Sequence, residues 1–148
     1  MNQNGAKIVS VNISSKKGVR KKPVGRAAVV VDHGIDGDAH AANWHRQISL
    51  LAQESIDKMV SMGLNVGPGD FAENLTTLGI DLLSLPIGTK LRVGEDTVLE
   101  VTQIAKECHT RCAIYRQAGD CVMPKEGIFV RVIHGGEVHV GDTVAIEE

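Results

Sequence analysis

The chain has 148 residues, a formal net charge of −2 at pH 7 and a pI near 6.3. That length fits one domain able to bury its own core, and the near-neutral charge excludes a whole-domain electrostatic match to nucleic acid. No apolar run approaches the roughly 20 residues of a membrane span and the polar start lacks a signal-peptide core, so we expect a soluble protein without membrane contact.

Period-2 alternation of apolar residues dominates the chain and predicts short strands. In chain order these strands cover residues 8–13, 27–31, 48–51, 91–93, 98–104, 128–133, 138–140 and 143–146. One amphipathic helix is predicted over residues 53–62 and ends at Gly63, a C′ residue. The pair Gly135-Gly136 is expected to supply the positive φ angles of a hairpin.

These elements predict a mainly β fold in which residues 1–148 form a single domain. Many short strands, glycine-rich turns and one or two short helices favour a closed or partly closed β-barrel. A doubly wound fold would need longer helices that alternate with the strands. Since aromatic residues make up only 3% of the chain, the core must be aliphatic.

All three cysteines lie in one short stretch directly after a predicted strand: Cys108, Cys112 and Cys121. His109 and Arg111 lie between the first two, and positive neighbours favour the thiolate, the form that attacks, carries sulfur or binds metal. A short helix capped at Thr110 would add its N-terminal dipole to this effect. We therefore expect Cys108 to be reactive, whereas Cys112 is equally well explained as a small packed hydrophobe. An odd cysteine count without an export signal favours reduced thiols in the cytoplasm.

Two other uses of the cysteines are weaker on sequence. A zinc site would normally show C-x2-C pairs, and the C-x3-C spacing of Cys108 and Cys112 matches no common pattern. A cysteine protease would need a histidine facing the thiol, which the adjacent His109 rarely does. The distant His40 could serve as the base, but no nucleophile motif supports that arrangement.

The polar loop over residues 34–46 carries further candidate residues: Asp38, His40, Trp44, His45 and Arg46. These side chains crowd hydrogen-bonding groups into one glycine-containing segment that also holds the only tryptophan. A metal cluster is one interpretation, but aspartates in glycine-rich turns are usually turn formers, and without a recognised spacing that second interpretation is stronger.

A second loop, over residues 67–77, contains Glu73 and Asn74, which lead directly into an apolar strand. Its glycines can present backbone N–H groups to an anion, and the Glu-Asn pair can orient a polar ligand. The loop lacks the lysine and the glycine spacing of a Walker A or dinucleotide fingerprint.

A local basic run precedes both loops and consists of Lys16, Lys17, Arg20, Lys21 and Lys22. A solvated loop is the default interpretation of such a run. The functional alternative is a clamp for a phosphate-bearing ligand.

Taken together, these segments resemble the MOSC domain, a family named after the C-terminal part of molybdenum-cofactor sulfurase. The resemblance covers nearly the whole chain and is specific through the order of its segments: 33–40 with Arg46, 69–76, 79–81, 87–88, 93–94, 99–103 followed by Cys108, 131–132 and 135–142. It implies a stand-alone short member with a β-barrel of complex, pyruvate-kinase-like topology. In the family, the cysteine at the position of Cys108 is proposed to accept sulfur from a pyridoxal-phosphate desulfurase or to coordinate molybdenum.

One departure from the family pattern affects the site. The family commonly shows Pro-Cys where this chain has Glu107-Cys108, which makes Cys112 a credible substitute or a second thiol that resolves a persulfide. We predict four catalytic residues: Cys108, Cys112, His109 and Arg111. Cys108 is also the predicted metal ligand, and the predicted cofactor-binding residues are Asp38, His40, Arg46, Glu73, Asn74 and Arg131.

Three functions are compatible with these residues. The first is a sulfur carrier that takes sulfur from a cysteine desulfurase and delivers it to a metal-sulfur or molybdopterin acceptor, with pyridoxal phosphate held only by that separate desulfurase. The second is a molybdenum-cofactor-binding module, such as part of a reductase, with the cysteine as metal ligand. The third is a non-catalytic partner of molybdenum-cofactor enzymes. The enzyme class stays open between a sulfurtransferase and a molybdenum-cofactor-dependent activity, as does the oligomeric state.

Overall fold

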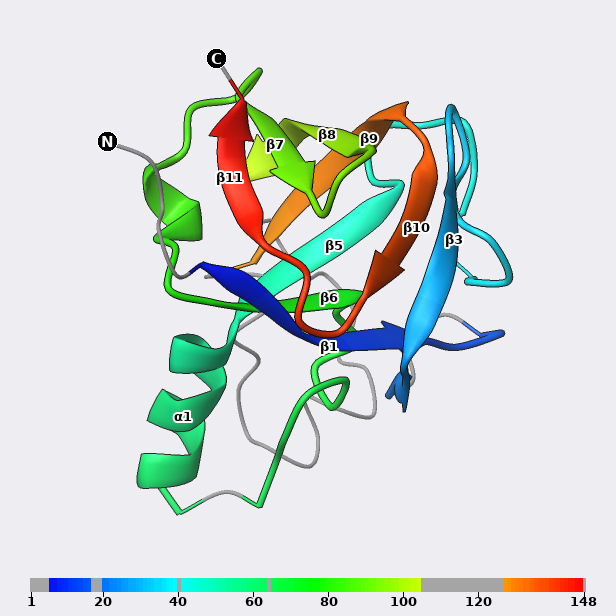
Figure 1. Ribbon diagram of the computed structural model, residues 1–148. Coiled ribbons are helices and arrows are strands. Elements are labelled where there is room, and N and C mark those ends of the chain that lie inside the picture. The colour runs from blue at the N-terminus through cyan, green and yellow to red at the C-terminus, as the bar shows by residue number, and fades with distance from the viewer. Residues whose placement is uncertain (1–5, 17–19, 40, 64, 105–126, 148) are drawn as a thin grey trace.

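The computed structural model describes residues 6–16, 20–39, 41–63, 65–104 and 127–147, and within these ranges the protein is mainly β with one α-helix (Figure 1). In chain order the elements are β1 (Lys7–Ile13), β2 (Lys22–Val24), β3 (Arg26–Val30), β4 (Gly34–Ile35), β5 (Ile48–Ala52), α1 (Gln53–Ser61), β6 (Leu75–Leu78), the 3-10 helix η1 (Leu82–Ser84), β7 (Lys90–Val93), β8 (Thr97–Ile104), β9 (Ile128–His134), β10 (Gly136–His139) and β11 (Val144–Glu147). The described strands form an eight-stranded sheet in the order β11-β7-β8-β9-β5-β6-β1-β2 and a three-stranded sheet in the order β10-β3-β4.

Each predicted strand has a counterpart, with ends that shift by one or two residues, and the apolar strand after Asn74 is β6. The helix is also confirmed: α1 ends at Ser61, and Gly63 follows at φ 97° with its N–H donating to the Val60 carbonyl at 2.9 Å. β2 and β4 were not predicted. In the described ranges, no helix has the length and apolar character needed to span a membrane.

The predicted closed or partly closed barrel is not confirmed, because neither described sheet is closed into a barrel. The larger sheet ends at β11 on one side and at β2 on the other. The chain just before β11 nevertheless lies beside β1 (Figure 1), where the Ile8 N–H donates to the Asp142 carbonyl and the Gly141 N–H donates to the Ile8 carbonyl, both at 2.8 Å. An isolated bridge joins Lys7 to Thr143 there, so the sheet curls back on itself without a continuous strand ladder.

The core is aliphatic, as composition predicts, and both sheets contribute to it. Leu50, Leu75 and Leu99 from the large sheet are fully buried with Val29 and Val138 from the small sheet in one cluster. Helix α1 contacts β5 and β6 and buries Ile56 and Met59, while Val60 is 47% exposed. The two sheets therefore enclose one shared core.

The Gly135-Gly136 pair does not form the predicted hairpin. Neither residue has a positive φ, and β9 and β10 belong to different sheets. A Cβ on Gly135 would lie 2.6 Å from the Val29 carbonyl oxygen, and one on Gly136 would lie 2.8 Å from Oγ1 of Thr97. Glycine is needed at both positions because the backbone that connects the two sheets lies too close to Val29 and Thr97 to leave room for a Cβ.

Candidate functional site

Only part of the predicted site falls on described residues. His40 lies outside them, as do the predicted helix after Thr110 and the predicted catalytic residues Cys108, His109, Arg111 and Cys112. Their catalytic and metal-binding roles stay predictions. The described strand nearest to them in sequence is β8, whose last residue, Ile104, precedes Cys108 by four positions.

Arg46 lies against the end of β8. Its Nε donates to Oε1 of Gln103 at 3.0 Å, and its guanidinium lies 5.4 Å from the ring centre of Phe129 and 5.9 Å from that of Trp44. His45 Nε2 contacts the same Gln103 oxygen at 3.0 Å, and the Thr102 hydroxyl donates to the His45 carbonyl. The segment Trp44 to Arg46 is thus held beside the strand that leads to the cysteines.

Asp38 forms a buried ion pair with Lys21. Lys21 Nζ lies 2.8 Å from Oδ1 of Asp38, and both side chains are 0% exposed. The same carboxylate oxygen accepts the Ser14 backbone N–H at 3.1 Å, and Lys21 Nζ donates to Ser14 Oγ at 3.2 Å. Because burying these charges removes their hydration, the pair depends on such mutual contacts. Asp38 is therefore an internal link between loops.

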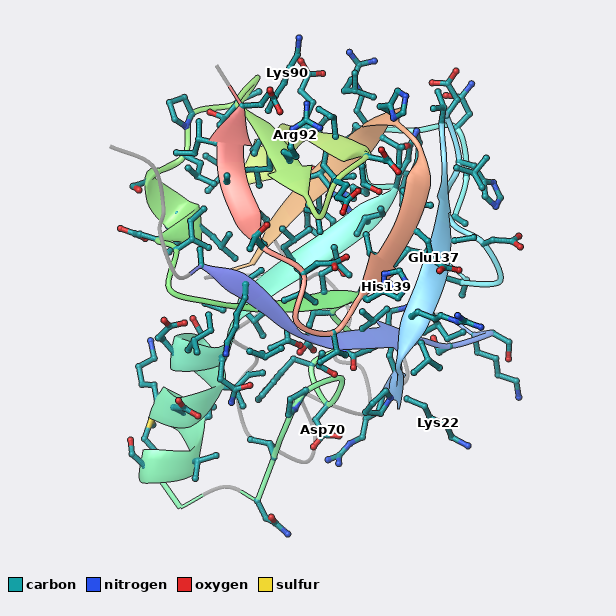
Figure 2. The ribbon with its side chains drawn as sticks, viewed as in Figure 1. Lys22, Asp70, Lys90, Arg92, Glu137 and His139 are labelled. Atoms are coloured by element: carbon teal, nitrogen blue, oxygen red, sulfur yellow. The ribbon has the colours of Figure 1, made fainter. Side chains whose placement is uncertain are left out.

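A basic pocket adjoins this ion pair. It has a volume of about 450 Å³ and is lined by Ile13, Ser14, Ser15, Lys16, Arg20, Lys22, Val24 and Gly37. Lys16 and Lys22 are exposed, and Figure 2 shows Lys22 pointing away from the sheets. Arg20 is half-buried, with its Nη1 at 3.3 Å from Oδ1 of Asp70. No acidic residue is among the described residues that line the pocket, so it favours an anion.

The basic run is therefore split by the structure. Lys16, Arg20 and Lys22 face the pocket, whereas Lys21 points inward, and Lys17 lies outside the described residues. The alternating side-chain directions of extended backbone put Lys21 opposite its two neighbours. That alternation is the signal in the sequence from which an inward lysine could have been predicted.

Gly69 fixes the backbone beneath the basic run. The Lys21 N–H donates to the Gly69 carbonyl at 2.8 Å, and a Cβ on Gly69 would clash with the Lys21 carbonyl oxygen. Gly69 also has a φ of 86°, which L side chains rarely adopt. The loop at 67–70 and the basic run can approach this closely only with glycine at this position.

Glu73 is fully buried behind Gly69. Its Oε2 accepts the Gly69 N–H at 3.0 Å and the Thr76 hydroxyl at 2.7 Å, while its Oε1 has no hydrogen-bond partner among the described residues. Burial raises the pKa of Glu73, and the hydrogen bonds from Gly69 and Thr76 oppose that rise without cancelling it. In the described structure, Glu73 does not reach the surface, so its role at a ligand stays a prediction.

Asn74 belongs to a buried polar network that joins three strands. Its Oδ1 accepts the Ser49 N–H at 3.0 Å, and its Nδ2 donates to the Asn12 carbonyl at 3.2 Å. Asn12 in turn donates to the Glu73 carbonyl and to Thr76 Oγ1. The sequence reading missed Asn12 and Ser49, because their partners are far away in the chain. The network ties β1, β5 and the residues before β6 together.

Arg131 lies apart from these groups. It is on β9, directly opposite Glu100 on β8, and its Nε lies 2.6 Å from Oε1 of that residue. The arginine side chain is 48% exposed. Its predicted contact with a cofactor stays a prediction.

The donor set of the described residues fits a phosphate group better than a metal ion. In the ranges that the structure describes, no three His, Cys, Asp or Glu side chains gather to hold a metal. Cationic side chains with serine hydroxyls, as in the basic pocket, are the donors that bind phosphate. The basic pocket is therefore the place among the described residues whose side chains suit a phosphate group.

Comparison with known proteins gives the fold and the family model. A model described as "MOSC domain" matches residues 36–145. The YUAD protein of Bacillus subtilis has a similar structure, with a TM-score of 0.78 and 20% identity over 99% of this chain and 96% of that one. YiiM of Geobacillus stearothermophilus gives a TM-score of 0.72 and 21% identity over 97% of this chain and 75% of its own. YiiM of Escherichia coli gives 0.68 and 18%, over 96% and 70%. Among curated proteins no sequence match was found.

Proposed function

The chain belongs to the MOSC domain family, which is associated with molybdenum-cofactor-related proteins, and on that premise we propose that it binds a phosphate-bearing molybdenum cofactor through the basic pocket. The observation that carries the proposal is the pocket itself. Lys16, Arg20 and Lys22 present cations to it, and Ser15 adds a hydroxyl, while the Ser14 hydroxyl already donates to the Lys16 carbonyl at 2.8 Å. Charged donors give hydrogen bonds roughly twice as strong as neutral ones, so a phosphate is favoured over a neutral ligand.

The rest of the cofactor site is proposed along the loop at 34–46 and the end of β8. Gly37 of this loop lines the pocket, while its other end, Arg46, contacts Gln103 on β8. Cys108, five residues after Gln103 in the sequence, would supply the thiolate, a soft ligand suited to a molybdenum centre. A bound molybdenum cofactor would supply redox chemistry, and this chain would hold the phosphate and the metal.

The test is the cofactor content of protein purified from molybdate-fed cells. Wild-type protein should contain both molybdenum and pterin, and the Lys16→Gln/Lys22→Gln variant should lose most of both, since two pocket cations are gone. The matched control is Lys58→Gln/Lys90→Gln, which removes the same charge at exposed positions outside the basic pocket. Wild-type protein that is empty of both and takes up no added cofactor would contradict the proposal.

A second candidate function is sulfur transfer by Cys108, favoured by the histidine and the arginine that neighbour it in the sequence. In the proposed step, the Cys108 thiolate attacks the terminal sulfur of a persulfide carried by a cysteine desulfurase. A new S–S bond forms at Cys108, the donor S–S bond breaks, and the donor cysteine leaves as a thiolate, so no external oxidant or reductant is needed. Cys112 would then resolve the persulfide or share the sulfur.

This candidate is tested by incubating the protein with a cysteine desulfurase and cysteine and locating added sulfur by peptide mass spectrometry. A mass increase of one sulfur atom on Cys108 is expected, and it should disappear in Cys108→Ala. If Cys108 and Cys112 both stay unmodified, sulfur transfer is excluded. If Cys108→Ala also leaves cellular function intact, the chain acts as a non-catalytic partner in cofactor biosynthesis.

A further inference from the structure

Three segments that line the basic pocket meet at one buried ion pair. Ser14 contacts both partners, since its N–H donates to Asp38 Oδ1 at 3.1 Å and its hydroxyl accepts from Lys21 Nζ at 3.2 Å. Lys21 sits between the pocket cations Arg20 and Lys22 in the sequence. Asp38 follows Gly37, which lines the pocket from the loop at 34–46.

The ion pair contributes no net charge to the pocket. Lys21 and Asp38 are both 0% exposed at the side chain and 2.8 Å apart, so their charges sum to zero and only the weaker field of their dipole reaches the pocket. Neither residue is among those that line the pocket. We therefore expect their main influence on an anion to act through the positions of neighbouring residues.

Backbone contacts extend the same connection. The Ala39 N–H donates to the Ser14 carbonyl at 2.8 Å, and the Lys21 N–H donates to the Gly69 carbonyl at 2.8 Å. The three pocket-lining segments are short and in part exposed, and between Lys16 and Arg20 the chain passes through residues 17–19, outside the described ranges. An ion pair that already holds these segments in place lowers the entropy cost of ordering them when a ligand binds.

We propose that Lys21 and Asp38 are positioning residues for anion binding: their buried ion pair holds Ser14, Arg20, Lys22 and Gly37 in the geometry that accepts a phosphate ester. The inference rests on the proposed function for the class of ligand. It adds two residues that touch no ligand but set how well the pocket binds one.

The experiment replaces both partners together, because removing one would leave an unpaired buried charge and could unfold the protein. Lys21→Met/Asp38→Leu removes the pair and the acceptor for the Ser14 N–H. Lys21→Met/Asp38→Asn removes the pair but retains an oxygen that can accept that N–H. Neither double variant changes the net charge of the protein.

The matched control removes an exposed ion pair elsewhere. Arg92 Nε lies 2.5 Å from Oε2 of Glu147 on β7 and β11, and Figure 2 shows Arg92 at the end of the molecule away from Lys22. Arg92→Gln/Glu147→Gln therefore also preserves net charge and should leave phosphate binding unchanged. The probe is glycerol 3-phosphate, titrated into each purified protein by NMR, with the melting temperature measured in parallel.

We expect the dissociation constant of glycerol 3-phosphate to rise about tenfold in the Met/Leu variant, in which preorganisation of the pocket is fully lost. In the Met/Asn variant the dissociation constant should rise by less, because preorganisation is lost only in part. The ranking of the two variants by melting temperature should differ from their ranking by affinity. If both variants bind the probe as tightly as wild type, the role of the Lys21–Asp38 pair is wrong, but phosphate binding in the basic pocket stands.

If wild-type protein does not bind the probe, phosphate binding in the pocket and the role of the ion pair are both wrong. An empty cofactor preparation with intact probe binding contradicts only the cofactor assignment.

Discussion

At the scale of single residues, Glu73 is an ionisable group that the fold buries completely, away from the water that would stabilise its charge. It is 0% exposed, and one of its carboxylate oxygens lacks a hydrogen-bond partner among the described residues. Ala72 before it adopts a φ of 65°, a conformation that costs about 1–2 kcal/mol for an L residue. The local strain and the buried acid occur together in the loop that packs against Lys21.

Glu73 should make stability fall as pH rises. Burial raises its folded pKa above the unfolded value near 4.5, so the native state binds more protons than the unfolded state above that pH. The destabilisation is absent below about pH 4.5, grows with pH at a slope of at most about 1.4 kcal/mol per pH unit, and levels off above the folded pKa. Glu73→Gln should therefore gain stability relative to wild type as pH rises, measured by urea unfolding at several pH values.

The control for this prediction is Glu95→Gln at an exposed position between β7 and β8. Its difference from wild type, measured over the same pH range, is the reference for removing a carboxylate from the surface. A Glu73→Gln difference with the same pH profile as this reference would show that burial does not shift the titration of Glu73.

At the scale of elements, the connection between β9 and β10 constrains the fold more tightly than the strand sequences do. β9 leaves the large sheet and β10 joins the small one, with only Gly135 between them. The chain makes this change of sheet so close to the Val29 carbonyl that no side chain fits. This contact couples the end of β9 to β3.

Gly135→Ala should destabilise the protein by about 2–4 kcal/mol, because the new methyl group must push β9 and β3 apart. Gly25→Ala is the matched control, since no atom lies within 4 Å of a Cβ there and its φ is not positive. It should change stability by less than about 1 kcal/mol. The free energy of unfolding of both variants is measured by chemical denaturation. Equal losses in the two variants would contradict the close approach at Gly135.

Local sequence patterns predict most of the strands and the helix. The features that were not predicted are those that leave no local pattern in the sequence. β5 is buried at four consecutive positions and was located as a short apolar run. Alternation located β1 and β8, because one face of each packs on the aliphatic core. It missed β2, which contains Pro23, and the two-residue β4, since neither is long enough to show a period. Closure of the sheet also could not be read from the sequence, because it depends on which edges meet in space.

The candidate site was predictable to a lesser degree. A solvated loop was the default interpretation of the basic run, and a phosphate clamp was the alternative. Lys16 and Lys22 do line a pocket, but the inward Lys21 depends on Asp38, 17 residues further along the chain. Glu73 and Asn74 were predicted as ligand contacts because a plain connecting loop does not explain a Glu-Asn pair directly before an apolar strand. Their burial depends on tertiary partners such as Ser49 and Asn12, which no local pattern reveals.

At the scale of the whole molecule, the two sheets share one aliphatic core and should not unfold separately. Trp44, the only tryptophan, lies in the loop that contacts β8 and β9, whereas far-UV circular dichroism reports all strands. Urea transitions followed by the two signals should therefore coincide. Val138→Ala in β10 should lower both midpoints equally, since Val138 is 0% exposed in the common core. Two separated midpoints would contradict a shared core.

The pairing of Ile104 with Ile128 has a consequence for how this protein can be engineered. Directly opposed residues of an antiparallel ladder hold their Cα atoms about 5 Å apart, so the framework fixes the two ends of the intervening stretch as closely as a hairpin would. A variant in which a short turn replaces residues 105–126 is therefore expected to keep the register of β8 and β9 while losing any activity that needs Cys108. Such a variant would separate what the framework contributes from what the cysteines contribute.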